Sequence, residues 1–472
     1  MRGAWSTLAL VAVAAGLGAY IYFIDAKRPE TAAKEKVFAV EADAVEELRI
    51  VAKGDTTVLR KTDNAWQMVE PLATDADGNE VTAFVGGLTS LELSREVDPK
   101  AADLAQYGLA SPKADITFTA KGGTKGRLRL GDQTPTGTDI YAVKGDDARV
   151  FLVSTFAETS LVRSAFDLRD KRVLRFERDK VDALAITTAG GTTELSRTNS
   201  EWRLAAPSGA RGDYGAIEGL LTRLSTMMMS GIAATDLSTL PKYGLDKPTA
   251  TVVVKTGSSS ATLALGTSAD GKTFARDLAR PMVFTIDAAG ATDLEKGADD
   301  YRRKDVFDLR PFSVRSLVFT RGADTITLQK KAGSGTTPTD TWTITGPGAT
   351  AARDAKAELI DDLLTKVSGL RASGFVAAAA KGATSALKVS AQFDESRKEE
   401  ASFARMGAEV FAVRADEAGA SRLDAGAFDE MVKALDTVLA PPAPATPAPP
   451  TAPATSEAKP EAKPEAKPEP KP

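Results

Sequence analysis

The chain has 472 residues, of which 43% are hydrophobic and 26% charged, so it is long enough for two to four folded domains. Its formal charge of −4 argues against nucleic-acid binding, which needs a clustered basic surface. The sequence contains no cysteine and no histidine, which excludes thiol nucleophiles, disulfides, Cys/His zinc sites and histidine-dependent catalysis. We therefore expect a protein without cofactor, metal or catalytic residues, and not an enzyme.

An uncharged apolar stretch near the N-terminus, residues 5–24, is long enough to cross a bilayer as a helix. It fits either an uncleaved anchor or a cleaved signal peptide, and the poor small-residue cleavage sites favour an anchor over residues 1–28. Basic residues flank both ends, so the orientation depends on the resemblance to an export signal. We expect a single-pass protein of the bacterial inner membrane, with its body in the periplasm.

A long internal repeat is marked by three of the four tryptophans, which are 136 and 140 residues apart. Spacings of this size indicate whole repeated domains. The shared positions are a tryptophan and the proline five residues after it: Trp66 and Pro71, Trp202 and Pro207, and Trp342 and Pro347.

Each tryptophan follows alternating apolar residues that predict a β-hairpin, and each proline precedes apolar residues at helical spacing. The helical positions are Val81, Phe84, Val85, Leu88 and Leu91; Ile217, Leu220, Leu221, Leu224 and Met228; and Leu359, Ile360, Leu363, Leu364, Val367 and Leu370. We predict an α+β fold with three tandem repeats over residues 37–172, 173–305 and 306–438. In each repeat, one amphipathic helix packs on an antiparallel sheet built from the hairpin.

A Tyr-Gly-Leu block recurs in the first two repeats, at Tyr107 and Tyr243, and strands ending in Leu-Gly follow it. The rings could stack on a sugar, but packing of the turn over the hairpin explains them equally well and is the favoured interpretation. The third repeat lacks the block and looks degenerate. It keeps "SFAR" at Ser402, which we match with "TFAR" at Thr273.

Basic residues recur where one repeat meets the next, as Arg169 and Lys171 and again as Arg302 and Lys304. They could bind an anionic lipid or glycan. Aspartates lie among them, so ion pairs between repeats are the better explanation, each contributing little if exposed.

Three weaker motifs favour structural interpretations. "DADGNE" from Asp75 resembles half of a calcium loop but lacks the later ligands, so it predicts a helix cap. "SALK" from Ser385 has the spacing of serine–lysine acyl transfer, yet its alternating surroundings predict a strand, which sends the two side chains to opposite faces. Met227–Met229 are expected to continue the second helix and fill apolar space.

The C-terminal segment, residues 440–472, is rich in Pro, Ala, Lys and Glu. Frequent prolines remove backbone donors and prevent helix formation, so a disordered, extended tail is expected.

Together, the tryptophan-ended hairpin, the helix, the Tyr-Gly-Leu block, the Leu-Gly strands and the Arg-x-Lys connector resemble the domain of unknown function 4340 family, in tandem copies. The resemblance covers residues 37–310 well and 311–438 weakly. It implies a membrane-anchored envelope protein associated with ABC-type export or gliding-motility systems, and it implies no catalytic motif.

The leading hypothesis is a non-enzymatic envelope scaffold or accessory subunit, with protein partners such as ABC-type transporter subunits. An envelope glycan- or ligand-binding module is the alternative. A carboxylate-dependent hydrolase would need two converging carboxylates, and no motif indicates such a pair.

Overall fold

The computed structural model describes residues 13, 15–16, 35–206, 209–333, 340–349, 351–393 and 397–440. The predicted anchor over residues 1–28 lies outside them except at three positions. The predicted tail over residues 440–472 lies outside them except for Ala440, and Pro207 is also outside. No helix in the described part of the chain combines the length and apolar character of a membrane span.

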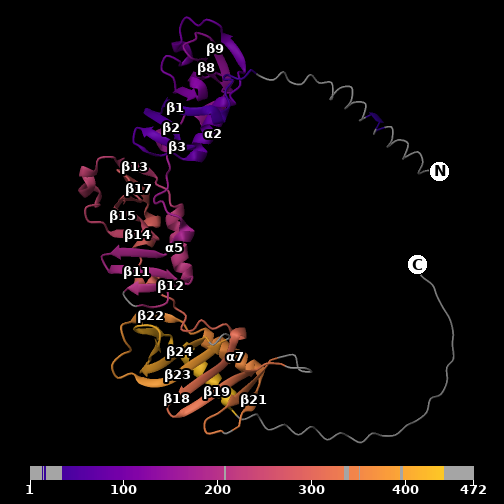
Figure 1. Ribbon diagram of the computed structural model, residues 1–472, viewed down its shortest axis with the longest axis vertical. Helices are drawn as coiled ribbons and strands as arrows, with labels where there is room; N and C mark the ends of the chain where they lie inside the picture. Colours follow the sequence, from indigo (N-terminus) through magenta and orange to yellow (C-terminus); the bar gives the residue numbers. More distant parts are fainter. Residues whose placement is uncertain are drawn as a thin grey trace, which may run out of the picture. The chain divides into compact units, whose positions relative to one another are not determined.

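The described chain is an α+β protein with three antiparallel sheets (Figure 1). Sheet 1 contains β1 (Val45–Ala52), β2 (Asp55–Thr62), β3 (Ala65–Glu70), β4 (Thr74–Asp75), β5 (Arg95–Asp98), β6 (Ala114–Ala120), β7 (Lys125–Gln133), β8 (Asp139–Lys144) and β9 (Val150–Ser154). Sheet 2 contains β10 (Ala183–Thr188), β11 (Gly191–Thr198), β12 (Glu201–Ala206), β13 (Gly231–Ala234), β14 (Ala250–Thr256), β15 (Ser259–Ala269), β16 (Lys272–Asp277) and β17 (Val283–Asp287). Sheet 3 contains β18 (Val314–Arg321), β19 (Asp324–Lys331), β20 (Thr341–Thr345), β21 (Arg353–Ala355), β22 (Ala372–Val376), β23 (Thr384–Phe393), β24 (Lys398–Met406), β25 (Glu409–Arg414) and β26 (Ala420–Leu423).

Helices connect and cover these strands. The α-helices are α2 (Gly78–Thr89), α3 (Phe156–Leu161), α4 (Ala165–Leu168), α5 (Tyr214–Thr226), α6 (Ala288–Thr292), α7 (Ala357–Ser368) and α8 (Ala425–Leu439). The 3₁₀ helices are η2 (Ala42–Ala44), η3 (Ala105–Tyr107), η4 (Lys121–Gly123), η5 (Arg178–Lys180), η6 (Leu237–Tyr243), η7 (Asp293–Glu295), η8 (Ala298–Asp300) and η9 (Pro311–Ser313).

The three sheets share one topology. The strand order in sheet 1 is β4-β3-β2-β1-β6-β7-β8-β9-β5, and in sheet 3 it is β21-β20-β19-β18-β23-β24-β25-β26-β22. Over the described residues, sheet 2 follows the same order without a counterpart of β4. After the first three strands, the chain passes through the long helix to the opposite edge, where β5 pairs with β9. It then returns to the centre, where β6 pairs with β1. We call each sheet with its long helix (α2, α5 or α7) a repeat.

Each repeat has its own apolar core between one sheet face and the long helix. In the first repeat, Leu48 and Ile50 on β1 are fully buried, as is Val81 on α2. Alternating strand residues and helix residues three and four apart therefore meet on one side. Burial of each such side chain contributes about 1.5–3 kcal/mol.

The repeated tryptophans are buried on the third strand of each sheet, with Trp66, Trp202 and Trp342 8%, 3% and 5% exposed. Pro71 and Pro347 are exposed and follow the ends of β3 and β20. The predicted order of hairpin, tryptophan strand and helix is therefore present in each repeat.

The predicted helices extend too far at their C-terminal ends. α2 ends at Thr89, α5 at Thr226 and α7 at Ser368, so Leu91, Met228 and Leu370 are not helical. The expectation that the methionine run continues the second helix is wrong. Met228 is 53% exposed and forms a bridge with Arg172.

The third repeat contains a second long helix, so the prediction of one amphipathic helix per repeat is wrong there. Phe428, Met431 and Leu435 on α8 are buried in the same core as α7. Lys366 on α7 also pairs with Glu430 on α8 at 2.6 Å. In the first two repeats, only short helices follow the corresponding strands, α3 and α4 after β9 and α6 after β17.

Contacts divide the chain into two compact units. The first unit is Met1–Lys304 with Asp416–Ala418, and it contains sheets 1 and 2. The second unit is Asp305–Ala415 with Gly419–Pro472, and it contains sheet 3.

Candidate functional site at the connector between the first two repeats

The segment 167–176 joins the first two repeats, and we call it the connector. Its first half pairs with the chain just before α2. The amide of Asp77 donates to the carbonyl of Leu168 at 2.9 Å, and the amide of Asp170 donates to the carbonyl of Asp75 at 3.1 Å. The start of the first long helix is thereby fixed to the end of its own repeat.

Its second half pairs with the chain just after α5. The amide of Val173 donates to the carbonyl of Met227 at 2.9 Å, and the amide of Met229 donates to the carbonyl of Lys171 at 2.8 Å. This pairing explains why α5 stops at Thr226, because the backbone groups beyond it bond to the connector. One short segment therefore joins the start of α2 to the end of α5 by backbone hydrogen bonds.

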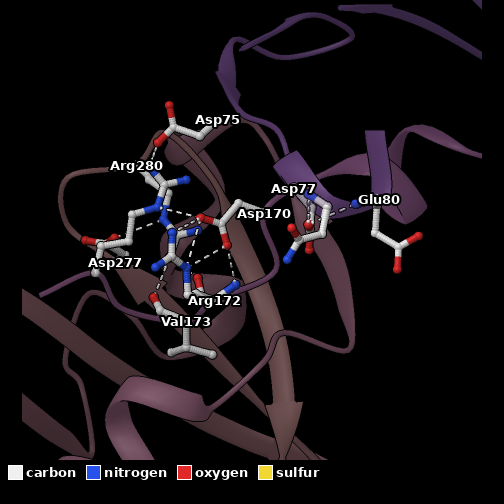
Figure 2. Close-up of polar contacts among 10 residues, drawn as sticks. Asp75, Asp77, Glu80, Asp170, Arg172, Val173, Asp277 and Arg280 are labelled. Atoms are coloured by element: carbon white, nitrogen blue, oxygen red, sulfur yellow. Dashed lines mark hydrogen bonds and ion pairs between the residues drawn. The ribbon is translucent and has the colours of Figure 1, made fainter. Parts of the chain in front are cut away.

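An aspartate at the middle of the connector organises a cluster of ion pairs (Figure 2). Asp170 is 6% exposed and pairs with Arg172 at 2.7 Å and with Arg175 at 3.0 Å. Arg175 also pairs with Asp75 next to α2. The hydrogen bonds from Arg172 to Asp170 raise the pKa of the Arg172 guanidinium, so this side chain stays charged.

A buried arginine binds the connector from sheet 2 (Figure 2). Arg280 pairs with Asp277 at 2.9 Å and donates to the carbonyls of Arg172, at 2.6 Å, and Val173. Both charged side chains are less than one-tenth exposed. Carboxylates and carbonyls from both repeats thus satisfy several donors of this cluster, but its cations are not Arg169 or Lys171, for which the sequence predicted ion pairs.

Arg169, a candidate ligand residue, has a different environment. It is 1% exposed, and its guanidinium donates to the sulfur atoms of Met68, at 3.6 Å, and Met282, at 3.5 Å. Burial and the nearby charge of Arg280 lower the pKa of Arg169. Its Nε has no partner among the described residues. Arg169 therefore lies inside the junction, and it does not form the ion pair that the sequence led us to expect.

The remaining connector candidates differ from one another. Lys171 donates to the carbonyl of Asp167 at 3.0 Å and lies 5.7 Å from the Phe166 ring centroid. Arg302 is buried and pairs with Glu417 at 3.2 Å, whereas Lys304 is exposed. Lys171 and Lys304 therefore lie in different environments, although they occupy equivalent places in the sequence.

Both repeated tyrosines pack on aromatic side chains of their own sheet. Tyr107 is half-buried, its ring lies 4.9 Å from that of Tyr141, and its hydroxyl donates to Asp98 at 3.4 Å. Tyr243 is 8% exposed and lies 4.8 Å from Phe274. The rings therefore pack within the sheet, although on β8 and β16 and not on the predicted hairpin, and little of the Tyr243 ring is left for stacking on a sugar.

The Leu-Gly strands have a physical reason to accompany the Tyr-Gly-Leu turns. A Cβ atom at Gly131 would lie 2.2 Å from the carbonyl oxygen of Tyr107, and one at Gly266 would lie 2.0 Å from that of Tyr243. The turn can therefore rest on the strand only where the strand has glycine. The third repeat, which lacks the turn, has Ala404 at the corresponding position of β24.

The match between "TFAR" and "SFAR" is wrong as a structural equivalence. Thr273 lies on β16 and Ser402 on β24, and β24 is the counterpart of β15. The true counterpart of β16 is β25, where Phe411 occupies the position of Phe274. The two four-residue sequences are similar, but they lie on strands that are not equivalent in the two sheets.

Two of the weaker motifs have the predicted structural roles. Asp77, within "DADGNE", is the N-cap of α2 and accepts from the amides of Asn79 and Glu80. Ser385 and Lys388 lie on β23, and Lys388 pairs with Glu400 at 2.7 Å. The predicted strand is confirmed, but the expectation of opposite faces is wrong: a register shift between Ser385 and Leu387 pairs Ser385 with Ala404 and Lys388 with Ser402, which lie on one face of β24.

A comparison with protein families finds one that is described as "Domain of unknown function (DUF4340)". It matches residues 66–239 and, in an overlapping second match, residues 202–390, which together make up more than half of the chain. No curated protein matches the chain.

Among solved structures, two similar chains are both the DNA polymerase sliding clamp from Pseudomonas aeruginosa. The ligand-bound clamp is 9% identical over 82% of this chain and 92% of that chain, with a TM-score of 0.15. The other is 8% identical over 81% and 91%, with a TM-score of 0.16. TM-scores this low do not indicate a shared fold.

Proposed function

The chain belongs to the DUF4340 family, and from this premise we propose that it is a non-enzymatic scaffold, an accessory subunit of a membrane complex such as an ABC-type exporter. In this proposal, residues 1–28 anchor it in the bacterial inner membrane, and the repeats face the periplasm. Its partners are other envelope proteins, and it binds no nucleic acid.

The observation that carries the proposal is the double pairing of the connector. Backbone hydrogen bonds attach it to the start of α2 on one side and the end of α5 on the other. Buried Asp170 and Arg280 add charged contacts across the same junction. This construction fixes two repeats relative to each other, which suits a protein that presents surfaces to partners.

The chemistry of the connector also favours a scaffold over an enzyme. Asp170 and Asp277 each pair with arginine at 3.0 Å or less, so both carboxylates are already occupied by contacts within the chain. A general acid or base must be within hydrogen-bond reach of the substrate. The connector aspartates instead bind arginine and are nearly buried.

Co-purification tests the proposal. The full chain, tagged at its C-terminus, is crosslinked in its native membranes, solubilised in a mild detergent and analysed by mass spectrometry. We expect subunits of one membrane transporter to be enriched. A matched control carries the same tag on a chain whose residues 1–28 are replaced by an unrelated single-span helix, and it should retain the partners if the repeats bind them. Recovery of the chain alone in several detergents would contradict the proposal.

A further inference from the structure

The second repeat supplies a carboxylate to its own tryptophan. The indole Nε1 of Trp202 donates to Glu218 at 3.0 Å, and Glu218 pairs with Arg178 at 2.9 Å. The guanidinium of Arg197 lies 5.6 Å from the indole centroid, and its nitrogen lies 3.9 Å from Glu218. The carboxylate of Glu218 thus links the indole of Trp202 to the two arginines.

The first repeat has the same strand positions. Trp66 on β3 is directly opposite Lys61 on β2, as Trp202 on β12 is opposite Arg197 on β11. The indole donor and a neighbouring cation are therefore present in both copies.

The residue that faces the tryptophan from the long helix differs between the two repeats. Asp77 and Asp213 are the N-caps of α2 and α5, and both helices bury the residue four positions later, Val81 or Ile217. The next residue is Glu218 in the second repeat and Thr82 in the first. The first repeat therefore lacks the carboxylate that its indole and cation would bind.

A cavity of about 490 Å³ lies at this place in the first repeat. Trp66, Lys61 and Thr82 all line it. Trp66 is 8% exposed, and no described residue accepts a hydrogen bond from its Nε1 or pairs with the ammonium group of Lys61. The Nε1 atom itself keeps access to solvent through the cavity, so a ligand that enters the cavity can accept its hydrogen bond.

The acidic side chains at the cavity do not neutralise Lys61. Asp170 pairs with Arg172 and Arg175, and Asp75 pairs with Arg175. These two carboxylates are already matched by guanidinium groups. Lys61 is the cation at this cavity whose charge is free for an anion.

We propose that this cavity binds the carboxylate of a glutamate side chain from a protein partner, in the position that Glu218 occupies in the second repeat. The inference rests on the proposed scaffold function, because it names the chemistry by which a partner is recognised. Trp66 Nε1 donates to one carboxylate oxygen, and Lys61 supplies the opposite charge.

Indole NMR signals of the purified full chain, labelled with ¹⁵N at tryptophan, test this inference. The probe is the capped tripeptide acetyl-Gly-Glu-Gly-amide. We expect it to move the Trp66 Nε1–H signal and to leave the Trp202 signal unchanged. The matched probe with glutamine in place of glutamate should bind about tenfold more weakly, because it lacks the charge.

Three variants make the test specific. Thr82→Glu copies the second repeat, so it should move the Trp66 signal by itself and abolish the response to the tripeptide. Thr82→Ser is its matched control and should respond like the wild type. Lys61→Gln should weaken tripeptide binding at least about fivefold while leaving the other indole signals in place, which shows that the chain remains folded.

Several outcomes would overturn the inference: no movement of the Trp66 signal, equal binding of the glutamine probe, or an unchanged response in Thr82→Glu. Stronger binding of glucuronate than of the tripeptide would assign the cavity to an acidic glycan instead. If the tripeptide fails but transporter subunits co-purify, this site is wrong and the scaffold proposal stands. If the tripeptide binds but no partner co-purifies, the cavity binds a carboxylate, and the scaffold proposal and its protein partner are wrong.

Discussion

At the residue scale, a single backbone oxygen constrains the strand beneath each Tyr-Gly-Leu turn. Gly131→Ala places a methyl group against the carbonyl of Tyr107, so we expect the free energy of unfolding to fall by about 1–3 kcal/mol. Gly266→Ala should behave in the same way beneath Tyr243. Chemical denaturation of the purified chain measures both effects.

The third repeat supplies the control for this prediction. Ala404→Gly changes the corresponding strand position where no such turn lies above it, so we expect a loss of no more than about 1 kcal/mol, from backbone entropy. A larger loss at position 404 than at 131 would show that the close contact is not the cause.

Asp167 makes the stability of the first repeat depend on pH. Burial alone would raise its pKa, but hydrogen bonds from Ser164 and Lys53 outweigh this effect and lower the pKa to about 2. A carboxyl group whose pKa is lower in the folded chain stabilises it above the unfolded pKa, and this contribution disappears as the pH falls through the folded pKa. The contribution is therefore present above about pH 4 and is lost towards pH 2.

Asp167→Asn tests that dependence. At pH 7 we expect it to lower the free energy of unfolding by about 2 kcal/mol. The difference from the wild type should shrink steadily between about pH 4 and pH 2. Urea denaturation across this range measures it, and a difference that does not change with pH would contradict the assignment.

At the scale of elements, the three long helices begin differently. Asp77 and Asp213 cap α2 and α5 with their side chains, whereas Lys356 at the same position of α7 makes no side-chain cap. Its backbone is extended, as an N-cap requires. Lys356→Asp should therefore stabilise the third repeat by about 1 kcal/mol, both by accepting from amides of the first helical turn and by placing negative charge at the helix start.

Thermal unfolding of the full chain measures the effect of Lys356→Asp. Lys356→Ala is the matched control, because it removes the same positive charge without supplying an acceptor. If the two variants gain equally, charge removal and not capping explains the change.

The sequence predicts the elements that depend on neighbours along the chain. The hairpin before Trp66, the buried face of α2 and the cap at Asp77 follow from local spacing, and the structure contains all three. The helix ends were misplaced because the groups that stop α5 come from the connector, more than fifty residues earlier in the chain. The matching of Thr273 with Ser402 failed because strand register is set by partners across the sheet.

The candidate site was only partly predictable. The recurrence of Arg169 and Arg302 indicates a repeated junction, but the two methionine sulfurs around Arg169 come from segments on either side of the connector. Alignment of the three helices could have revealed the difference between Thr82 and Glu218. The consequence of that difference depends on a cavity that appears only once β2, β3, α2 and the connector are assembled.

At the scale of the whole molecule, the connector predicts cooperative unfolding of the first two repeats. Asp170→Asn removes the buried carboxylate that Arg172 and Arg175 share. Because both arginines keep access to solvent, we expect a loss of about 1–2 kcal/mol at this junction. The wild type should unfold sheets 1 and 2 in one calorimetric transition, and the variant should separate them into two.

An exposed ion pair near the connector provides the control. Glu177 pairs with Lys180 at 2.7 Å, and both side chains are more than two-thirds exposed. Glu177→Gln should change stability by less than about 1 kcal/mol. If it splits the transition as strongly as Asp170→Asn, the coupling does not arise from the buried cluster.

The return of the chain to the centre of each sheet has a consequence for synthesis. β1 (Val45–Ala52) and the next two strands can pair as soon as they are made, but the other edge of β1 waits for β6 (Ala114–Ala120). Until then, a row of unpaired amides and carbonyls is open to any other extended segment. The same delay recurs before β14 and before β23. The growing chain therefore has an unpaired strand edge at three stages of its synthesis. Folding of this protein is therefore most vulnerable to aggregation part-way through each repeat.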